Sequence, residues 1–192
     1  MDGPFDVTEF RRVLGYLPTG VTIITTNRAS GEPVGMTCNS FVSVSLKPSL
    51  VMFCVGNTSS TLPDLRRSGT FCVNILGNDQ ERLARQFSVK GVDRFAGVRW
   101  TESAAGPELP DAVAWLSCST DVEHVAGDHV ILVARVNALR ENGEESGPLV
   151  FHRGGFGSFH RFPRPVAPAG AAPRAGSNGG APAPSGVSGT VG

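Results

Sequence analysis

Residues 35–55, GMTCNSFVSVSLKPSLVMFCV, decide the fold of this chain. They contain two β-strand patterns, at 42–46 and 50–55, joined by a Lys-Pro-Ser turn. The second pattern is apolar on both faces, which is typical of a central strand in a barrel or sandwich. A short polar loop, residues 37–40, precedes both strands and can present N–H groups, hydroxyls and one amide to a flat ligand. Small polar residues at a strand start are also common in plain turns, so both interpretations stay open here.

The rest of the chain is mostly short strand patterns with a few helical ones. Strand patterns begin at residue 34 and occupy residues 21–26, 70–76, 112–125, 129–139 and 149–151, and helical patterns occupy 7–17, 62–67 and 79–87. The strands are sequential and closely connected, which favours an antiparallel barrel with added helices. No GxGxxG follows a strand, so a nicotinamide cofactor would not bind as it does on a parallel dinucleotide-binding sheet.

Composition limits the functional classes. The chain has 192 residues, enough for one domain, and its 17 basic residues balance 17 acidic ones, which gives no field that favours nucleic acid or an anionic membrane. The start of the chain does not resemble a signal peptide, and no run is apolar enough for a membrane span. The four cysteines lack metal-ligand spacing, so we expect no metal site and reduced thiols in a cytoplasmic protein.

The composition changes sharply at residue 163. Of the last 30 residues, 23 are Pro, Ala, Gly or Ser, and such a segment cannot bury enough apolar surface to fold. We therefore predict a folded domain over residues 1–162 and a disordered tail over 163–192.

Hydroxyl residues gather at 57–61, directly before the helical pattern at 62–67. They are good N-caps, and they are also the donors that a phosphate group prefers at a helix N-terminus. Sequence reasoning alone leaves both roles open.

With these pieces placed, the chain resembles the flavin reductase-like family, the short-chain NAD(P)H:flavin reductases with the FMN-binding split-barrel fold. The resemblance covers about residues 5–160 and rests on an ordered set of motifs. These are PTGVTIIT at 18–25, the segment at 35–55, NTSST at 57–61, GTFCVNIL at 69–76, RQFSVKGVDRFAGVRW at 85–100, GDH at 127–129 and PLVFHRGGFG at 148–157. It implies a mainly β fold, a six-stranded antiparallel Greek-key split barrel with short helices.

The resemblance also implies the residues of a flavin and nicotinamide site. Those expected to contact the isoalloxazine and ribityl groups are Thr37, Cys38, Asn39 and Ser40. The flavin site is expected to continue through Val55, Asn57, Thr58, Ser59 and Ser60, with Ser59 and Ser60 toward the phosphate. A segment expected to close over the flavin contains Phe87, Ser88 and Lys90. His129 is expected to meet the nicotinamide cofactor, with Arg153 to Phe156 nearby, although a histidine at a turn can also be merely exposed.

The implied activity is NAD(P)H-dependent reduction of FAD, or of FMN, by hydride transfer to flavin N5. NADH is expected rather than NADPH, and the cofactors carry the chemistry, so no protein nucleophile is required. A homodimer would pass diffusible reduced flavin to a separate monooxygenase. Two alternatives remain: a split-barrel redox carrier or sensor that keeps its flavin, and a reductase that passes electrons to a metal complex or quinone.

Overall fold

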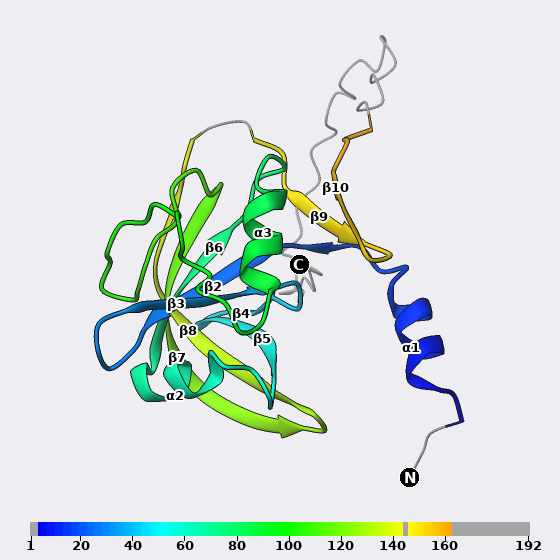
Figure 1. The fold of residues 1–192 in the computed structure, drawn as a ribbon, viewed down its shortest axis with the longest axis horizontal. Coiled ribbons are helices and arrows are strands. Elements are labelled where there is room, and N and C mark those ends of the chain that lie inside the picture. Colours follow the sequence, from blue (N-terminus) through cyan, green and yellow to red (C-terminus); the bar gives the residue numbers. More distant parts are fainter. Residues whose placement is uncertain (1–3, 144–145, 163–192) are drawn as a thin grey trace, which may run out of the picture. The chain divides into compact units, whose positions relative to one another are not determined.

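The computed structural model describes residues 4–143 and 146–162, and the predicted tail at 163–192 lies outside them (Figure 1). The helices are α1 (Val7–Leu14), α2 (Leu62–Ser68) and α3 (Glu81–Ser88). The strands are β1 (Thr19–Gly20), β2 (Thr22–Asn27), β3 (Pro33–Cys38), β4 (Val42–Leu46), β5 (Ser49–Gly56), β6 (Thr70–Ile75), β7 (Ala114–Ala126), β8 (His129–Glu141), β9 (Leu149–His152) and β10 (Gly155–Ser158).

The strands form two antiparallel sheets. The larger has the order β3-β2-β6-β7-β8-β5-β4, so β3 and β4 are its edges, and the smaller has the order β1-β9-β10. The mainly β, antiparallel prediction is confirmed. The large sheet has seven strands rather than six. The glycine-rich run at 153–157 predicts a turn, but its last three residues, with Ser158, form β10. Its pairing with β9 covers four residue pairs, a contact that local sequence does not reveal.

The larger core lies between the strongly curved sheet and α2. Phe53 and Phe71 meet edge to face with ring centroids 5.2 Å apart, and Leu62 and Leu65 of α2 pack on them from outside. Along β5 the buried residues are Val51, Phe53 and Val55. The alternation follows from the two-residue period of a strand, and it sends the intervening side chains to the outer face of the sheet.

A second core lies beneath α3, which crosses β2 and β3 in Figure 1. Ala84 and Phe87 point inward, and Phe87 meets Phe95 edge to face at 4.9 Å. Gly35 of β3 permits this close approach. A Cβ at that position would lie 2.9 Å from the Ile24 carbonyl oxygen and 3.0 Å from the Phe87 ring, so glycine lets α3 lie directly on the strand.

The connection between α3 and β7 is fixed by a buried polar group. The side-chain amide of Asn74 donates to the Ile23 carbonyl and to Thr25 Oγ1, each at 3.0 Å, and its oxygen accepts from Leu109 N–H at 2.7 Å. Trp115 Nε1 donates to the Leu109 carbonyl at 2.9 Å. Because these bonds satisfy polar groups away from water, they hold the irregular segment against the sheet.

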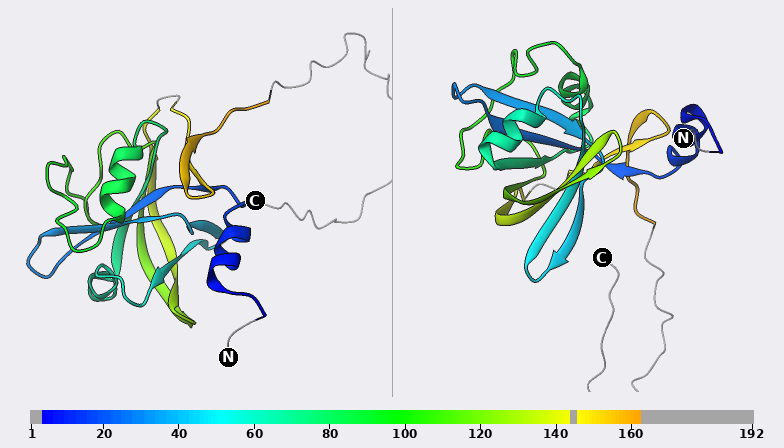
Figure 2. Two further views of the ribbon diagram at one scale, coloured as in Figure 1. Left: turned by 45° about the vertical axis from the view of Figure 1, so that its right-hand side comes forward. Right: turned by 90° about the horizontal axis from the view of Figure 1, so that it is seen from below.

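Helix α1 stands away from the sheet in both Figure 1 and Figure 2. It ends at Leu14, before Pro18, and none of its residues is buried; the apolar side chains Phe10, Val13 and Leu14 are about half exposed. The three-residue spacing of Asp6 and Glu9 predicts an N-cap, and the structure confirms it, because Asp6 accepts from Glu9 N–H at 2.7 Å. None of the helices in residues 4–143 and 146–162 has the length and hydrophobicity needed to cross a membrane.

Candidate functional site

The site is built along the outer edge of β3. The Gly35 carbonyl lies on that edge, since it accepts from Arg94 Nη1 at 2.7 Å and from Thr61 Oγ1 at 3.3 Å. Peptide groups on one side of a strand belong to alternate residues, so the N–H and C=O of Thr37 face the same way. The edge therefore offers an adjacent donor and acceptor, the pattern that the rim of a flat heterocycle can match.

The loop at 37–40 uses most of its side chains internally. The Thr37 hydroxyl donates to the Ala84 carbonyl at 2.6 Å and so ties β3 to α3. Cys38 is buried, and its burial raises the pKa of the thiol above the ordinary value. Ser40 Oγ accepts from Cys54 N–H at 2.9 Å. Of these four residues only Asn39 has an exposed side chain. The side chains of the other three hold the shape of the loop, and their backbone groups are left for contact with a ligand.

A cavity of about 310 Å³ opens beside this loop. It lies between β3, the C-terminal end of α3 and the β9–β10 hairpin, and its lining comprises Val21, Thr37, Asn39, Arg85, Ser88, Phe151, Gly154 and Phe156. The structure thus brings together four of the predicted residues, Thr37, Asn39, Ser88 and Phe156. Phe151 and Phe156 meet edge to face at 5.2 Å and give the cavity an aromatic wall.

Arg85 is the functional candidate that sequence reasoning missed in this cavity. Its guanidinium carbon lies 4.9 Å from the Phe156 ring centroid, and its Nη2 is 2.7 Å from Glu81. A cation at the mouth of an aromatic cavity can attract a phosphorylated ligand. The sequence contained no signal for this, because Arg85 on a helix with Glu81 four residues earlier is typical of a solvated ion pair.

The hydroxyl segment 57–61 lies across the outer edge of β3. Ser59 Oγ contacts Met36 Sδ at 3.7 Å, and Ser60 is exposed toward a separate cavity. Thr61 is buried and uses its hydroxyl on the Gly35 carbonyl, so it does not cap α2 with its side chain. Val55 is fully buried in the larger core, which leaves only its backbone for a ligand, whereas Thr58 is exposed.

Arg94 is the cation closest to this segment. Besides the Gly35 carbonyl it donates to the Val89 carbonyl at 2.7 Å and to Thr61 Oγ1 at 3.2 Å. All three acceptors are uncharged, and within the described ranges Arg94 forms no ion pair. Partial burial lowers its pKa below the ordinary value. A guanidinium held by neutral acceptors beside Ser60 fits an anionic phosphate.

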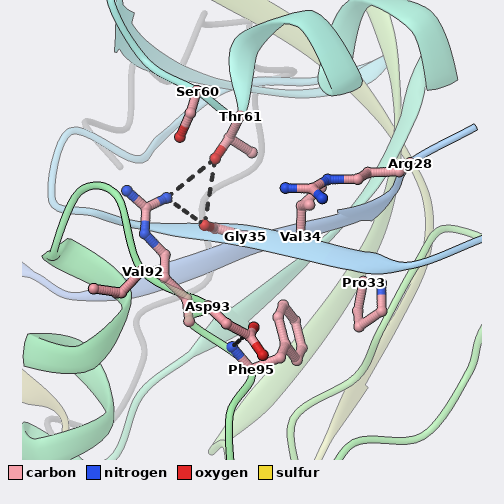
Figure 3. A pocket seen from close by; sticks show the side chains of 10 residues that line it. Arg28, Pro33, Val34, Gly35, Ser60, Thr61, Val92, Asp93 and Phe95 are labelled. Atoms are coloured by element: carbon pink, nitrogen blue, oxygen red, sulfur yellow. Dashed lines mark hydrogen bonds between the residues drawn. The ribbon is translucent and has the colours of Figure 1, made fainter.

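Two adjoining cavities, of about 60 Å³ and 530 Å³, lie near Arg94, and Figure 3 shows the smaller one. They share a lining of Arg28, Pro33, Ser60, Val92, Asp93 and Phe95. Arg94 donates to the Gly35 carbonyl and to Thr61 Oγ1, and Figure 3 shows Thr61 beside Gly35, with Pro33 farther along β3. Lys90, predicted from the resemblance to contact the flavin, is exposed on the same loop and lines none of the cavities described here.

His129 lies at the tip of the β7–β8 hairpin. Its Nδ1 is 2.8 Å from the Asp128 carboxylate. Its Nε2 is 3.7 Å from the position that a Cβ atom on Gly56 would occupy, so the ring lies directly against this glycine. Asn57 docks this tip, because its N–H donates to the Asp128 carbonyl at 2.9 Å and its side-chain amide donates to the Gly127 carbonyl at 3.2 Å. Asn57 therefore joins the hydroxyl segment to the histidine. The hydrogen bond from His129 is the main cause that lowers the pKa of Asp128.

The remaining predicted residues, Phe87 and Arg153, contact other parts of the protein and do not line the 310 Å³ cavity. Phe87 lies on the inner face of α3 and is fully buried. Arg153 adopts the left-handed conformation, with φ of 49°, and its guanidinium covers the Tyr16 ring with 4.7 Å between guanidinium carbon and centroid. Its N–H donates to the Gly15 carbonyl at 3.0 Å. Arg153 thus anchors the end of α1 to the β9–β10 hairpin.

Comparison with known proteins identifies the architecture. Residues 14–160 match the model of the family described as "Flavin reductase like domain". The chain is 46% identical over 150 residues to the reductase subunit HsaB of a flavin-dependent monooxygenase from Rhodococcus jostii, an alignment that covers 78% of this chain and 76% of that protein.

Two solved structures extend the similarity to the fold. Nitrilotriacetate monooxygenase component B from Mycobacterium thermoresistibile superposes with a TM-score of 0.77 at 37% identity, covering 84% of this chain and 93% of that one. The Streptomyces globisporus NADH:FAD oxidoreductase SgcE6, in complex with NAD and FAD fragments, superposes with a TM-score of 0.76 at 36% identity, covering 87% and 99%.

Proposed function

Since this chain belongs to the flavin reductase like domain family, we propose that it is an NAD(P)H:flavin oxidoreductase that supplies reduced flavin to a separate monooxygenase. The observation that carries the proposal is the 310 Å³ cavity, where Thr37, Asn39, Ser88 and the aromatic pair Phe151–Phe156 gather beside the outward peptide groups of β3. A flat redox cofactor needs such an apolar, rigid surface with a few polar groups that fix its orientation.

The residues present fit a flavin. The outward N–H and C=O of Thr37 would pair with the polar rim of the ring, and Asn39 adds an amide at the same place. Ser60 and the guanidinium of Arg94 would hold the phosphate, since a partly buried cation bonded only to neutral acceptors is stabilised by an anion. The proposed phosphate contact is thus Arg94, on the loop after α3, while Lys90 stays a predicted member of the segment that closes over the flavin.

Nicotinamide and flavin, when bound together, supply a hydride donor at C4 and an acceptor at N5. The protein needs to hold two rings in contact and to keep water away from them. Phe151 and Phe156 form an apolar wall for the second ring, and Arg85 at the mouth of the cavity would attract the phosphates of the incoming dinucleotide.

His129 is the proposed contact for the nicotinamide cofactor. The Asp128 carboxylate accepts from Nδ1 and so orients the imidazole with Nε2 toward Gly56, where Nε2 can accept from a carboxamide N–H or, when the ring is protonated, donate to a phosphate oxygen. We propose NADH as the donor and FAD as the flavin, in line with SgcE6, which is named an NADH:FAD oxidoreductase. The four free cysteines are consistent with action in the cytoplasm.

A homodimer is proposed from the outer face of the large sheet. Strand register places Val42, Met52, Val133 and Val122 directly opposite one another across β4, β5, β8 and β7. This row faces away from the core, because Val51 and Phe53 on the alternate face are buried. Val42 is 45% and Val122 40% exposed. An apolar row across four strands is the kind of surface that a second copy of the chain covers.

A steady-state assay of the purified protein tests the function. NADH oxidation is followed without flavin, with FAD and with FMN, and NADPH replaces NADH in a fourth arm. The proposal predicts oxidation that depends on added flavin and saturates with it. A protein that is yellow as purified and has negligible turnover with either flavin would instead be a carrier or sensor.

A further inference from the structure

The turn that joins β9 to β10 carries a residue that its backbone conformation disfavours. His152 pairs with Gly155, so the turn consists of two residues. These are Arg153 and Gly154, with φ of 49° and 81°. A two-residue turn in which both φ values are positive favours Asn-Gly or Gly-Gly, because a side chain is strained in the left-handed region. The preference of the turn therefore does not explain the arginine, whose contacts lie elsewhere.

Arg153 reaches from this turn to the end of α1 (Figure 1). Its N–H donates to the Gly15 carbonyl at 3.0 Å, and its guanidinium carbon lies 4.7 Å from the centroid of the Tyr16 ring. A cation at this distance over an aromatic face makes a favourable contact. Because α1 buries none of its residues, its attachment depends on contacts of this kind at its end.

The other side of the same hairpin forms the aromatic wall of the 310 Å³ cavity. Gly154 and Phe156 line this cavity, and Phe156 lies opposite Phe151 in the strand register. Phe151 pairs in turn with Thr19 of β1, the strand that follows α1. The sheet is small, since β1 has two residues and β10 has four. Strands this short are weakly held by their own ladders, so a contact at the turn has a strong influence on the wall.

Helix α1 also lies near the second part of the proposed nicotinamide site. After the hydrogen bond from His129, the charge of Arg11 is among the causes that lower the pKa of Asp128. Asp128 orients His129, so α1 lies within electrostatic reach of the hairpin tip that carries the histidine. One helix end is thus placed beside both elements that the dinucleotide would contact.

We propose that Arg153 is a positioning residue for the nicotinamide cofactor. By clamping the end of α1 to the β9–β10 turn, it fixes the wall of Phe151 and Phe156 against which the nicotinamide ring lies. The lining of the cavity includes Gly154 but not Arg153, so the guanidinium acts through Tyr16 and the turn. The inference rests on the proposed flavin reductase function and deepens it, because it names a residue outside the cavity that sets the affinity for NADH.

A double-mutant cycle on Arg153 and Tyr16 tests the inference in the full-length chain. Arg153→Gly removes the side chain, suits the left-handed backbone and keeps the N–H, and Tyr16→Leu removes the ring from the opposite side of the contact. Arg153→Lys keeps a cation and Tyr16→Phe keeps a ring. Arg12→Ala, on an α1 side chain that is 63% exposed, is the matched control. Circular dichroism checks that each variant is folded.

We expect Arg153→Gly and Tyr16→Leu each to raise the KM for NADH by about two- to fivefold, the equivalent of one cation–π contact near the surface. The double variant should have the KM of the single variants, because both substitutions remove the same contact. The kcat and the dissociation constant of the flavin should keep their wild-type values. Both conservative variants and the control should have the wild-type KM.

A guanidinium that touched the phosphates of NADH directly would give another result. Arg153→Gly would then raise the KM, Tyr16→Leu would leave it unchanged, and the clamp would be overturned. Additive increases, an unchanged KM in both single variants, or a weaker flavin affinity in Arg153→Gly would also overturn it. Each of these results leaves the proposed function standing, since it requires flavin-dependent NADH oxidation by the wild type. If the wild type shows no such oxidation, the proposed function and this role of Arg153 both fail.

Discussion

His129 shows how a single residue acquires a role from its neighbours. On its own, a histidine in a Gly-Asp-His turn is compatible with an exposed position and nothing more. The structure adds an Asp128 carboxylate on Nδ1, a glycine beneath Nε2, and an Asn57 side chain that docks the turn onto the hydroxyl segment. Asn57, which the resemblance assigns to the flavin site, also holds the turn that carries this histidine.

We predict that His129→Ala raises the KM for NADH and leaves the dissociation constant of the flavin nearly unchanged. The loss of one hydrogen bond corresponds to about 1–3 kcal/mol in kcat/KM. Asp128→Asn should produce a smaller effect of the same kind, since it preserves shape and removes charge. Steady-state kinetics and flavin titration measure the two constants. His124→Ala, on the same hairpin, is the control. A fall in flavin affinity in His129→Ala would show that His129 contacts the flavin rather than the nicotinamide cofactor.

At the scale of elements, the site depends on three contacts that hold a helix and two irregular segments to strands. Gly35 lets α3 lie on β3, and Arg94 ties the loop after α3 to the same strand. Asn74 does the same for the connection before β7. Each contact joins residues far apart in the chain, so the cavities exist only when these segments are docked.

Asn74→Leu should destabilise the protein. The substitution leaves Leu109 N–H and the Ile23 carbonyl without their side-chain partner in a buried place, which costs about 1–3 kcal/mol per unsatisfied group. Urea unfolding measures the change in the free energy of unfolding. Asn137→Ala, at an exposed position on β8, should change it by less than about 0.5 kcal/mol. Equal effects at the two positions would contradict the role given to Asn74.

The contact between α2 and β7 should depend on pH. Arg66 Nε donates to Glu123 at 2.9 Å, and this hydrogen bond lowers the pKa of Glu123 below its ordinary value of 4.5. A depressed carboxylate pKa means that the pair stabilises the fold above pH 4.5 and that this contribution disappears as the pH falls through the lowered pKa.

The melting temperatures of wild type and Arg66→Gln should therefore differ at neutral pH and converge as the pH falls below 4.5. The difference is expected to be small, because both groups are near the surface. Arg82→Gln, an exposed substitution on α3, is the control and should show no such convergence. A difference that stays constant down to acid pH would show that Arg66 acts through packing alone.

At the scale of the whole molecule, the apolar row Val42–Met52–Val133–Val122 stands out, because it lies on a sheet face where, among residues 4–143 and 146–162, Val42 and Val122 remain 45% and 40% exposed. It begins two residues after Ser40, so the polar loop of the flavin site runs directly into this surface. Association through the row would bring the second copy close to both flavin sites.

A charge placed in this row should prevent dimer formation. We expect Val133→Arg to sediment as a monomer at concentrations where wild type is a dimer, because an unpaired guanidinium cannot be buried in an apolar interface without a large penalty. Analytical ultracentrifugation measures the state. Val89→Arg, at an exposed position on the loop after α3, should leave the dimer intact, and a wild-type monomer would refute the proposed interface.

The sequence by itself determined most strands of the large sheet, the three helices, the Asp6 cap and the membership of residues 37–40, 57–61 and 129 in one family pattern. These follow from local periodicity, turn chemistry and ordered motifs, which act over a few residues. Only the tertiary structure decided that Arg94 rather than Lys90 faces the hydroxyl segment, that Arg85 joins the 310 Å³ cavity, and that α1 leaves its apolar face exposed. The physical reason is that these features depend on which distant segments pack together, and packing is set by the shape and burial of the whole core rather than by any local pattern.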